Sequence, residues 1–180
     1  MRNRAVLYRV RNAFCPTGKG GGVDPTCSPH TSGKVIPERP PAIIGQGRLQ
    51  TDAICDYIDK YGTECKAGRL PGDVLPGKPN LCYDNATQLA IRDPKRFQYT
   101  EGIAYTPTIP GLAFLHAWGT DTKTGKVVDP TWKEPEKCTY YGVKYNNKQY
   151  IKYIMKTGYY GVLGGSNEDA PRVLRDGTLK

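Results

Sequence analysis

Histidine, tryptophan and methionine are scarce, with two residues of each in a chain of 180. No apolar run approaches the roughly 18 residues that a membrane-spanning helix requires, so we expect no membrane partner. The first residues, 1–9, lack the apolar stretch of a secretory signal peptide, and we therefore expect a cytoplasmic protein. With so few histidines a zinc site has weak support, and we expect no metal and no cofactor.

Cysteine is present six times, but no two cysteines have the spacing of a Cys-x-x-Cys pair. Without a secretory signal, free thiols are favoured over a disulfide framework. Cys55 and Cys65 have no base nearby in the sequence, and we expect both to be structural. The redox state of the cysteines outside the site described below stays open.

The net charge is +9, from 26 lysines and arginines against 17 aspartates and glutamates. A basic balance of this kind suits a nucleic-acid partner. Here the basic residues are scattered and no nucleic-acid motif is present, so a solvated basic surface is the favoured interpretation. A preference for acidic partners or substrates is the second interpretation.

Glycine and proline are concentrated in the segment bracketed by Cys15 and Cys27. Such a composition cannot bury a face and is typical of a flexible arm. The segment lacks the Gly-x-x-x-x-Gly-Lys-Ser/Thr pattern of a phosphate-binding loop. A third interpretation is a recognition or processing tag whose glycines enter the narrow cleft of a cysteine enzyme. The role of this segment stays open, and so does the oligomeric state.

The most informative stretch is 112–132. In residues 112–118 every second side chain, His116 among them, shares one face, which is the period of a strand. A turn-forming stretch follows at 119–125, and a second short strand ends at Asp129. Residues across an antiparallel pair lie within about 5 Å at Cβ, so we expect the His116 and Asp129 side chains to lie side by side. A carboxylate in that position orients the imidazole and leaves its other nitrogen available as a base.

Cys82 is the best-placed nucleophile for this base. It opens a run that reads as a helix over residues 82–91, and the positive end of the helix dipole favours the reactive thiolate there. Asn80, two residues earlier, is a plausible N-cap of that helix. Its side-chain amide is also a candidate donor to an oxyanion, beside the backbone N–H of Cys82. Capping is the favoured role of the two.

Three further residues are candidates for lining the site. Asn85 is close to Cys82 in sequence, and Trp118 follows His116 by two residues, packing beside the site or serving the core alone. Glu101 is a carboxylate among apolar and aromatic neighbours. It either lines the site or pairs with a buried base, or it faces solvent at a sheet edge.

These motifs, taken in order, resemble the core of the transglutaminase-like superfamily. The resemblance consists of Cys82 opening a helix, then Tyr-Thr-Glu-Gly-Ile-Ala-Tyr at 99–105, His-Ala-Trp at 116–118 and Val-Asp-Pro-Thr at 128–131. It covers residues 73–162, half of the chain. The glycine-rich N-terminal segment also resembles the N-termini of some phage-encoded proteins, which would make the host cytoplasm the place of action.

The resemblance implies a papain-like fold and a catalytic triad. Cys82 would be the nucleophile, His116 the base and Asp129 the residue that orients the base. The implied chemistry passes through a thioester on a protein or peptide substrate: peptidase or amidase hydrolysis, or acyl transfer to an amine. It does not choose between hydrolysis and transamidation, and it does not identify the substrate.

The expected fold class is α+β, with the helix that bears Cys82 packed on an antiparallel sheet that bears His116 and Asp129. We expect an N-terminal arm and linker over 1–49, a catalytic domain over 50–163 and a polar tail over 164–180. The other expected elements are helices at 51–61 (Thr51 as N-cap) and 148–156, and strands at 1–13, 97–105, 140–145 and 159–163.

The competing function is a catalytically inactive binding module. Such a protein would keep the papain-like fold for recognition and would use its basic surface to contact a protein or nucleic-acid partner. The reactivity of Cys82 and its dependence on His116 distinguish the two functions.

Overall fold

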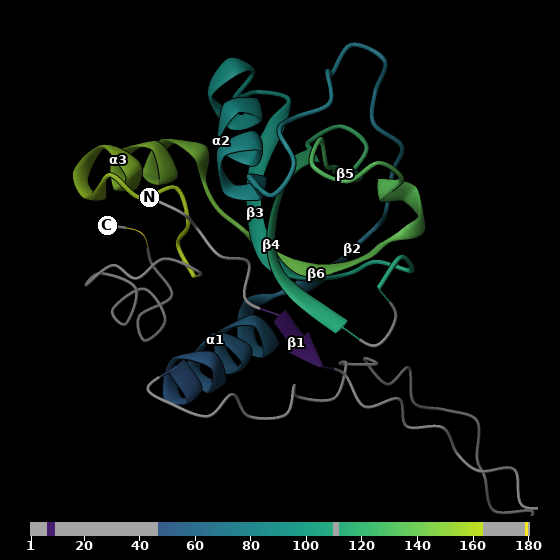
Figure 1. The fold of residues 1–180 in the computed structure, drawn as a ribbon. Helices are drawn as coiled ribbons and strands as arrows, with labels where there is room; N and C mark the ends of the chain where they lie inside the picture. Colours follow the sequence, from purple (N-terminus) through teal and green to yellow (C-terminus); the bar gives the residue numbers. More distant parts are fainter. Residues whose placement is uncertain (1–6, 10–46, 110–111, 164–178, 180) are drawn as a thin grey trace, which may run out of the picture.

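The computed structural model describes residues 7–9, 47–109, 112–163 and 179 (Figure 1). The predictions for the Cys15–Cys27 segment, for most of the 1–49 arm and for nearly all of the 164–180 tail lie outside these residues. Within them, no helix combines the length and the apolar character that crossing a membrane requires.

The chain is an α+β protein, as predicted. In chain order the elements are β1 (Leu7–Arg9), α1 (Gly47–Tyr61), β2 (Thr63–Cys65), α2 (Cys82–Arg92), β3 (Phe97–Tyr105), β4 (Leu112–Asp121), β5 (Val127–Val128), a 3₁₀ turn (Pro135–Lys137), β6 (Thr139–Lys144) and α3 (Asn147–Thr157). The expected helices and the strands at 97–105, 112–118 and 140–145 are thus present, with boundaries that differ by a few residues.

The strands form one antiparallel sheet that curls strongly (Figure 1). Its order is β1-β4-β3-β6-β2, and β5 pairs with β4 along the same edge as β1. A bridge between Lys66 and Lys126 connects the end of β2 to the start of β5, with the Val127 N–H donating to the Lys66 carbonyl at 2.9 Å. The two ends of the sheet therefore meet, and the curled sheet acquires an inner and an outer face.

The two faces carry different layers of the core. The outer face packs against α1, α2 and α3, in a cluster that includes Ile58, Ala86, Ala117, Tyr141 and Tyr150. The inner face is filled by a smaller cluster that includes Cys65, Ala104, Trp118, Val127 and Tyr140. Because side chains alternate between faces along a strand, His116 shares the inner face with Trp118.

Two glycines allow the inner face to close. A Cβ at Gly142 would lie 2.7 Å from the Trp118 ring, and one at Gly102 would lie 2.2 Å from the Tyr141 carbonyl oxygen. Gly102 lies on the central strand β3 and pairs with His116 of β4 on one side and with Gly142 of β6 on the other. The absence of a side chain makes room for the Trp118 ring at Gly142 and for the close approach of the β6 backbone at Gly102.

Three predictions about elements are wrong in part. Helix α1 begins at Gly47 and not at Thr51, so the last residues of the expected linker are helical and Thr51 is not its N-cap. The strand expected at 159–163 is absent from the described structure there, because the backbone N–H groups of Val162 and Leu163 donate to the Glu101 carboxylate at 2.7 and 2.8 Å. A loose polar tail was predicted over 164–180, but Leu179 is only 4% exposed and belongs to the outer core cluster.

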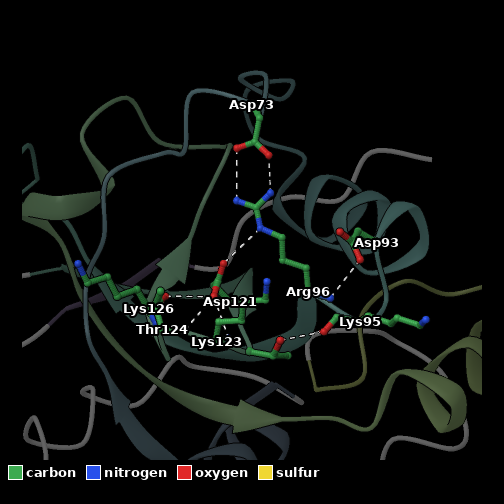
Figure 2. Close-up of polar contacts among 9 residues, drawn as sticks. Asp73, Asp93, Lys95, Arg96, Asp121, Lys123, Thr124 and Lys126 are labelled. Carbon is green, nitrogen blue, oxygen red and sulfur yellow. Dashed lines mark hydrogen bonds and ion pairs between the residues drawn. The ribbon is translucent and has the colours of Figure 1, made fainter.

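The long loop 66–80, which leads into α2, is tied to the rest of the molecule by Arg96 (Figure 2). The Arg96 guanidinium contacts both oxygens of Asp73 in this loop, and its Nε lies 3.3 Å from Oδ2 of Asp121. Asp121 in turn accepts from the backbone N–H of Thr124 at 2.9 Å, at the turn between β4 and β5. Exposed ion pairs add little stability, so the effect of Arg96 is chiefly to fix where the loop runs.

Candidate active site

His116 and Asp129 lie against each other inside the curled sheet. The Nε2 atom of His116 is 2.7 Å from Oδ2 of Asp129, and both side chains are almost fully buried. Asp129 follows directly after β5, whose residues Val127 and Val128 pair with β4. The strand-turn-strand arrangement predicted from the alternating pattern therefore brings the imidazole and the carboxylate together.

The Asp129 carboxylate has two further hydrogen-bond donors. The backbone N–H of Thr131 donates to Oδ1 at 2.8 Å, and the hydroxyl of Tyr140 donates to Oδ2 at 3.0 Å. A buried carboxylate is costly unless it is paired and hydrogen-bonded, and these contacts satisfy both oxygens. The orientation of the group is thus fixed from three directions. Tyr140 comes from β6, and its role is one that the sequence patterns did not indicate.

Cys82 is the first residue of α2, and its thiol is near enough to His116 to contribute to raising the pKa of the imidazole. Since Nε2 of the imidazole faces Asp129, Nδ1 is the nitrogen left for the thiol. Along the edge of β4, β1 pairs with residues 112–114 and β5 with 119–120, so among the described strands none pairs at residue 116 on this side. This gap leaves the sheet open beside His116, between the outer face on which α2 packs and the inner face that bears the imidazole.

The charges of the site favour an imidazolium. Burial alone would lower the pKa of His116, but the Asp129 carboxylate and the Cys82 thiol outweigh burial and raise the pKa to about 10. For the carboxyl group of Asp129 the effect of burial has the opposite sign, and burial alone would raise its pKa. The His116 charge and the hydrogen bonds from Thr131 and Tyr140 hold it below its usual value. At neutral pH the pair is therefore charged, with a proton on the imidazole next to the thiol.

Two tryptophans border the imidazole. The Trp132 ring stacks on the His116 ring, with 4.2 Å between centroids and 14° between planes. Trp118 is farther away, at 6.2 Å, and is fully buried, and its indole Nε1 has no hydrogen-bond partner among the described residues. Trp118 therefore packs beside the site, which is one of the two roles expected for it. Trp132 was not among the predicted site residues, although it lies three residues after Asp129.

Asn85 connects the loop before Cys82 to the turn after Asp129. Its amide nitrogen donates to the Lys78 carbonyl at 2.8 Å and to Thr131 Oγ1 at 3.0 Å, and its Oδ1 accepts from the Lys78 N–H at 3.1 Å. The Gly77 N–H adds a bond to the Pro130 carbonyl at 2.7 Å. Asn85 thus clamps the two segments that carry the nucleophile and the acid.

The prediction that Asn80 caps α2 is wrong. The N-cap position is Leu81, and no side chain caps the helix. Asn80 is exposed and has a positive φ of 62°, a left-handed conformation that asparagine adopts more readily than most residues. The backbone therefore turns at Asn80 immediately before the thiol, and its amide stays a candidate oxyanion donor.

Glu101 does not line the site. In the register of β3 and β4, Gly102 pairs with His116 and Glu101 with Ala117, so the Glu101 side chain points to the outer face. The alternative of an exposed sheet edge is also wrong, since β3 is a central strand and Glu101 is fully buried. Its carboxylate binds the chain at Val162 and Leu163, as described above.

Among the residues that the structure describes, no group of three or more histidine, cysteine or acidic side chains is arranged to hold a metal ion. The three other described cysteines, Cys55, Cys65 and Cys138, are buried, whereas Cys82 is partly exposed. Comparisons of the chain with protein-family models, with curated proteins and with solved structures found no match. The family expectation drawn from the motifs therefore stays a prediction.

Proposed function

We propose that this protein is a transglutaminase-like cysteine enzyme with a papain-like core, which acts on amide bonds of a protein or peptide through a thioester on Cys82. The observation that supports this proposal best is the position of His116 between an acid and a thiol. Its Nε2 is bound to Asp129 at 2.7 Å, and the Cys82 thiol is among the groups that raise its pKa. An imidazole between a carboxylate and a thiol at a helix start is the arrangement of an activated cysteine nucleophile.

In the acylation step, the Cys82 thiolate attacks the amide carbonyl carbon, and the C–N bond breaks as the tetrahedral intermediate collapses. The oxyanion accepts hydrogen bonds from the backbone N–H of Cys82, which a helix start leaves available, and from the side chain of Asn80. The His116 imidazolium gives its proton to the departing amine. Asp129 keeps the ring in place throughout.

In the second step, the neutral His116 takes a proton from the incoming nucleophile, which attacks the thioester carbonyl. Water completes a peptidase or amidase reaction, and an amine completes an acyl transfer. The thiolate then leaves, and the imidazolium–thiolate pair is restored. No metal or cofactor enters either step of this proposal. The proposed place of action is the cytoplasm, that of the host cell if the protein is phage-encoded.

The experiment that tests this proposal traps the thioester. The protein is mixed with p-nitrophenyl acetate, quenched in acid and mapped by mass spectrometry. We expect one acetyl group on the peptide that contains Cys82 and a matching burst of p-nitrophenol. The burst should disappear in Cys82→Ala and His116→Ala and persist in Cys55→Ser, which removes a buried thiol elsewhere. Equal slow acetylation of every thiol would contradict the proposal and favour the binding module.

A further inference from the structure

Tyr140 and His116 bind the same carboxylate oxygen. The Tyr140 hydroxyl donates to Oδ2 of Asp129 at 3.0 Å, and Nε2 of His116 lies 2.7 Å from that same atom. Tyr140 is fully buried, so water does not reach its hydroxyl to offer an alternative partner. The other oxygen, Oδ1, is occupied by the N–H of Thr131. The charge on Oδ2 is therefore divided between two donors.

We propose that Tyr140 is a positioning residue that sets the basicity of His116 by sharing the Asp129 oxygen to which the imidazole is bound. A carboxylate oxygen that already accepts one hydrogen bond is a weaker acceptor for a second, and it holds the imidazolium proton less tightly. Tyr140 thereby keeps His116 able to give up its proton. The catalytic meaning of this inference depends on the proposed function, but the inference about basicity does not.

The Tyr140 hydroxyl is itself suited to remain a donor. Burial, and next the neighbouring charge of Asp129, raise the pKa of Tyr140 far above its usual value, so the phenol keeps its proton at every pH of interest. The nearby thiol of Cys138 donates to the Glu134 carbonyl at 3.5 Å, and burial raises the pKa of Cys138 as well. Neither group therefore places a negative charge near Asp129 at neutral pH.

The titratable groups that face His116 are few among the described residues. Two of them act on the imidazole directly: Asp129, from the segment after β5, and Cys82, from α2. Tyr140 on β6 and Cys138 just before β6 influence the imidazole through their effect on Asp129. The nearest acidic residue on the adjacent strand, Glu101, points to the opposite face of the sheet. A change at Tyr140 should therefore reach His116 through Asp129.

The direct test is the titration of the His116 ring by NMR of protein labelled with ¹⁵N-histidine. The chain has two histidines, and His30→Gln identifies the signal of His116. The measurement is made in Cys82→Ala, which removes the thiol as a second influence and any turnover. Tyr140→Phe keeps the ring and deletes only the hydroxyl. We expect it to raise the pKa of His116 by about half a unit to one unit.

Tyr141→Phe is the matched control. It removes a buried hydroxyl from the next residue of the same strand, one that donates to the Gly62 carbonyl at 3.2 Å on the other face. We expect no shift of the His116 titration in this variant. An unchanged or lowered pKa in Tyr140→Phe would overturn the proposal, because loss of packing alone would alter stability without raising the pKa.

A second substitution of opposite sign keeps the test decisive if Tyr140→Phe folds poorly. A fluorinated tyrosine placed at position 140 by nonsense suppression is a stronger donor, and it should lower the pKa of His116. A raised or unchanged pKa there would contradict the proposal. If the NMR shifts appear but Cys82 forms no thioester in the trapping experiment, the proposed enzymatic function fails while this inference stands.

Discussion

The indole of Trp132 stacks on the imidazole of His116, with 4.2 Å between ring centroids and 14° between the ring planes. A cation over the face of an indole is stabilised by roughly 0.5–2 kcal/mol. Because the site favours the charged form of His116, Trp132→Leu should lower the pKa of His116 by up to about one unit. The ¹⁵N-histidine titration measures this shift directly.

Trp132→Phe is the matched control for that prediction, since it keeps an aromatic face over the imidazole. It should shift the titration less than Trp132→Leu does. Equal shifts in the two variants would mean that the stacked ring acts only by excluding water.

The stability of the protein should depend on pH through His116. The pKa of His116 is raised by folding, so its contribution is fully present below about pH 6.5, the usual value, and is lost as pH rises towards the folded value. In that window the slope is at most about −1.4 kcal/mol per pH unit, because the folded state holds one proton more. We expect this slope in Cys82→Ala, which leaves His116 and Asp129 in place, and its absence in Cys82→Ala combined with His116→Gln. Urea denaturation at a series of pH values measures both, and identical slopes would contradict the prediction.

The hydrogen bonds of Asn85 should affect the reactivity of Cys82 as well as the stability of the protein. Asn85→Ala removes three hydrogen bonds between loop 66–80, α2 and Thr131. We expect a loss of about 1–3 kcal/mol of unfolding free energy and slower alkylation of Cys82 in the fraction that is folded.

A pair of glycines in the same loop gives a sharper version of this test. A Cβ at Gly77 would lie 2.4 Å from the Asn85 side chain, whereas one at Gly72 would meet nothing within 4 Å. Gly77→Ala should therefore reproduce the loss of reactivity expected for Asn85→Ala, and Gly72→Ala should leave the reactivity of Cys82 unchanged. The prediction fails if both glycine variants behave alike.

Local patterns were enough to place His116 beside Asp129 and Cys82 at the start of a helix. The two-residue period, the turn and the short strand after it lie within a few residues of one another, so their pairing follows from neighbouring sequence. The contact of Tyr140 with Asp129 was beyond such reasoning, because it depends on the curl of the sheet and on its closure at Lys66 and Lys126. The clamp by Asn85 likewise joins segments 46 residues apart.

The errors at Asn80 and Glu101 have a similar origin. Asparagine before a helix is typical of an N-cap, but it is equally suited to a left-handed backbone conformation, and the chain uses the second property. The segment 159–163 has the composition of a strand. Its backbone donors are instead bound by Glu101, a carboxylate about sixty residues earlier in the chain, and no local pattern indicates a partner of that kind.

Glu101 provides a prediction that separates stability from reactivity. Glu101→Gln replaces an acceptor by an amide that cannot accept from both Val162 and Leu163, and it should lower the unfolding free energy by about 1–3 kcal/mol. Because Glu101 lies on the outer face, the alkylation rate of Cys82 in the folded protein should be unchanged. Urea denaturation and peptide mapping measure the two effects. A rate that falls as far as in His116→Ala would place Glu101 in the site after all.

The measurement that bears most directly on the account is the rate at which iodoacetamide modifies Cys82 near pH 7, followed by peptide mapping. A cysteine that a neighbouring imidazole activates should react roughly ten to thirty times faster than a thiol without such a base. We predict that Cys82 is modified well before Cys55, Cys65 and Cys138, and that His116→Ala removes this advantage. A Cys82 that reacts slowly, or at the same rate with and without the imidazole, would contradict the proposal that these residues form an active site.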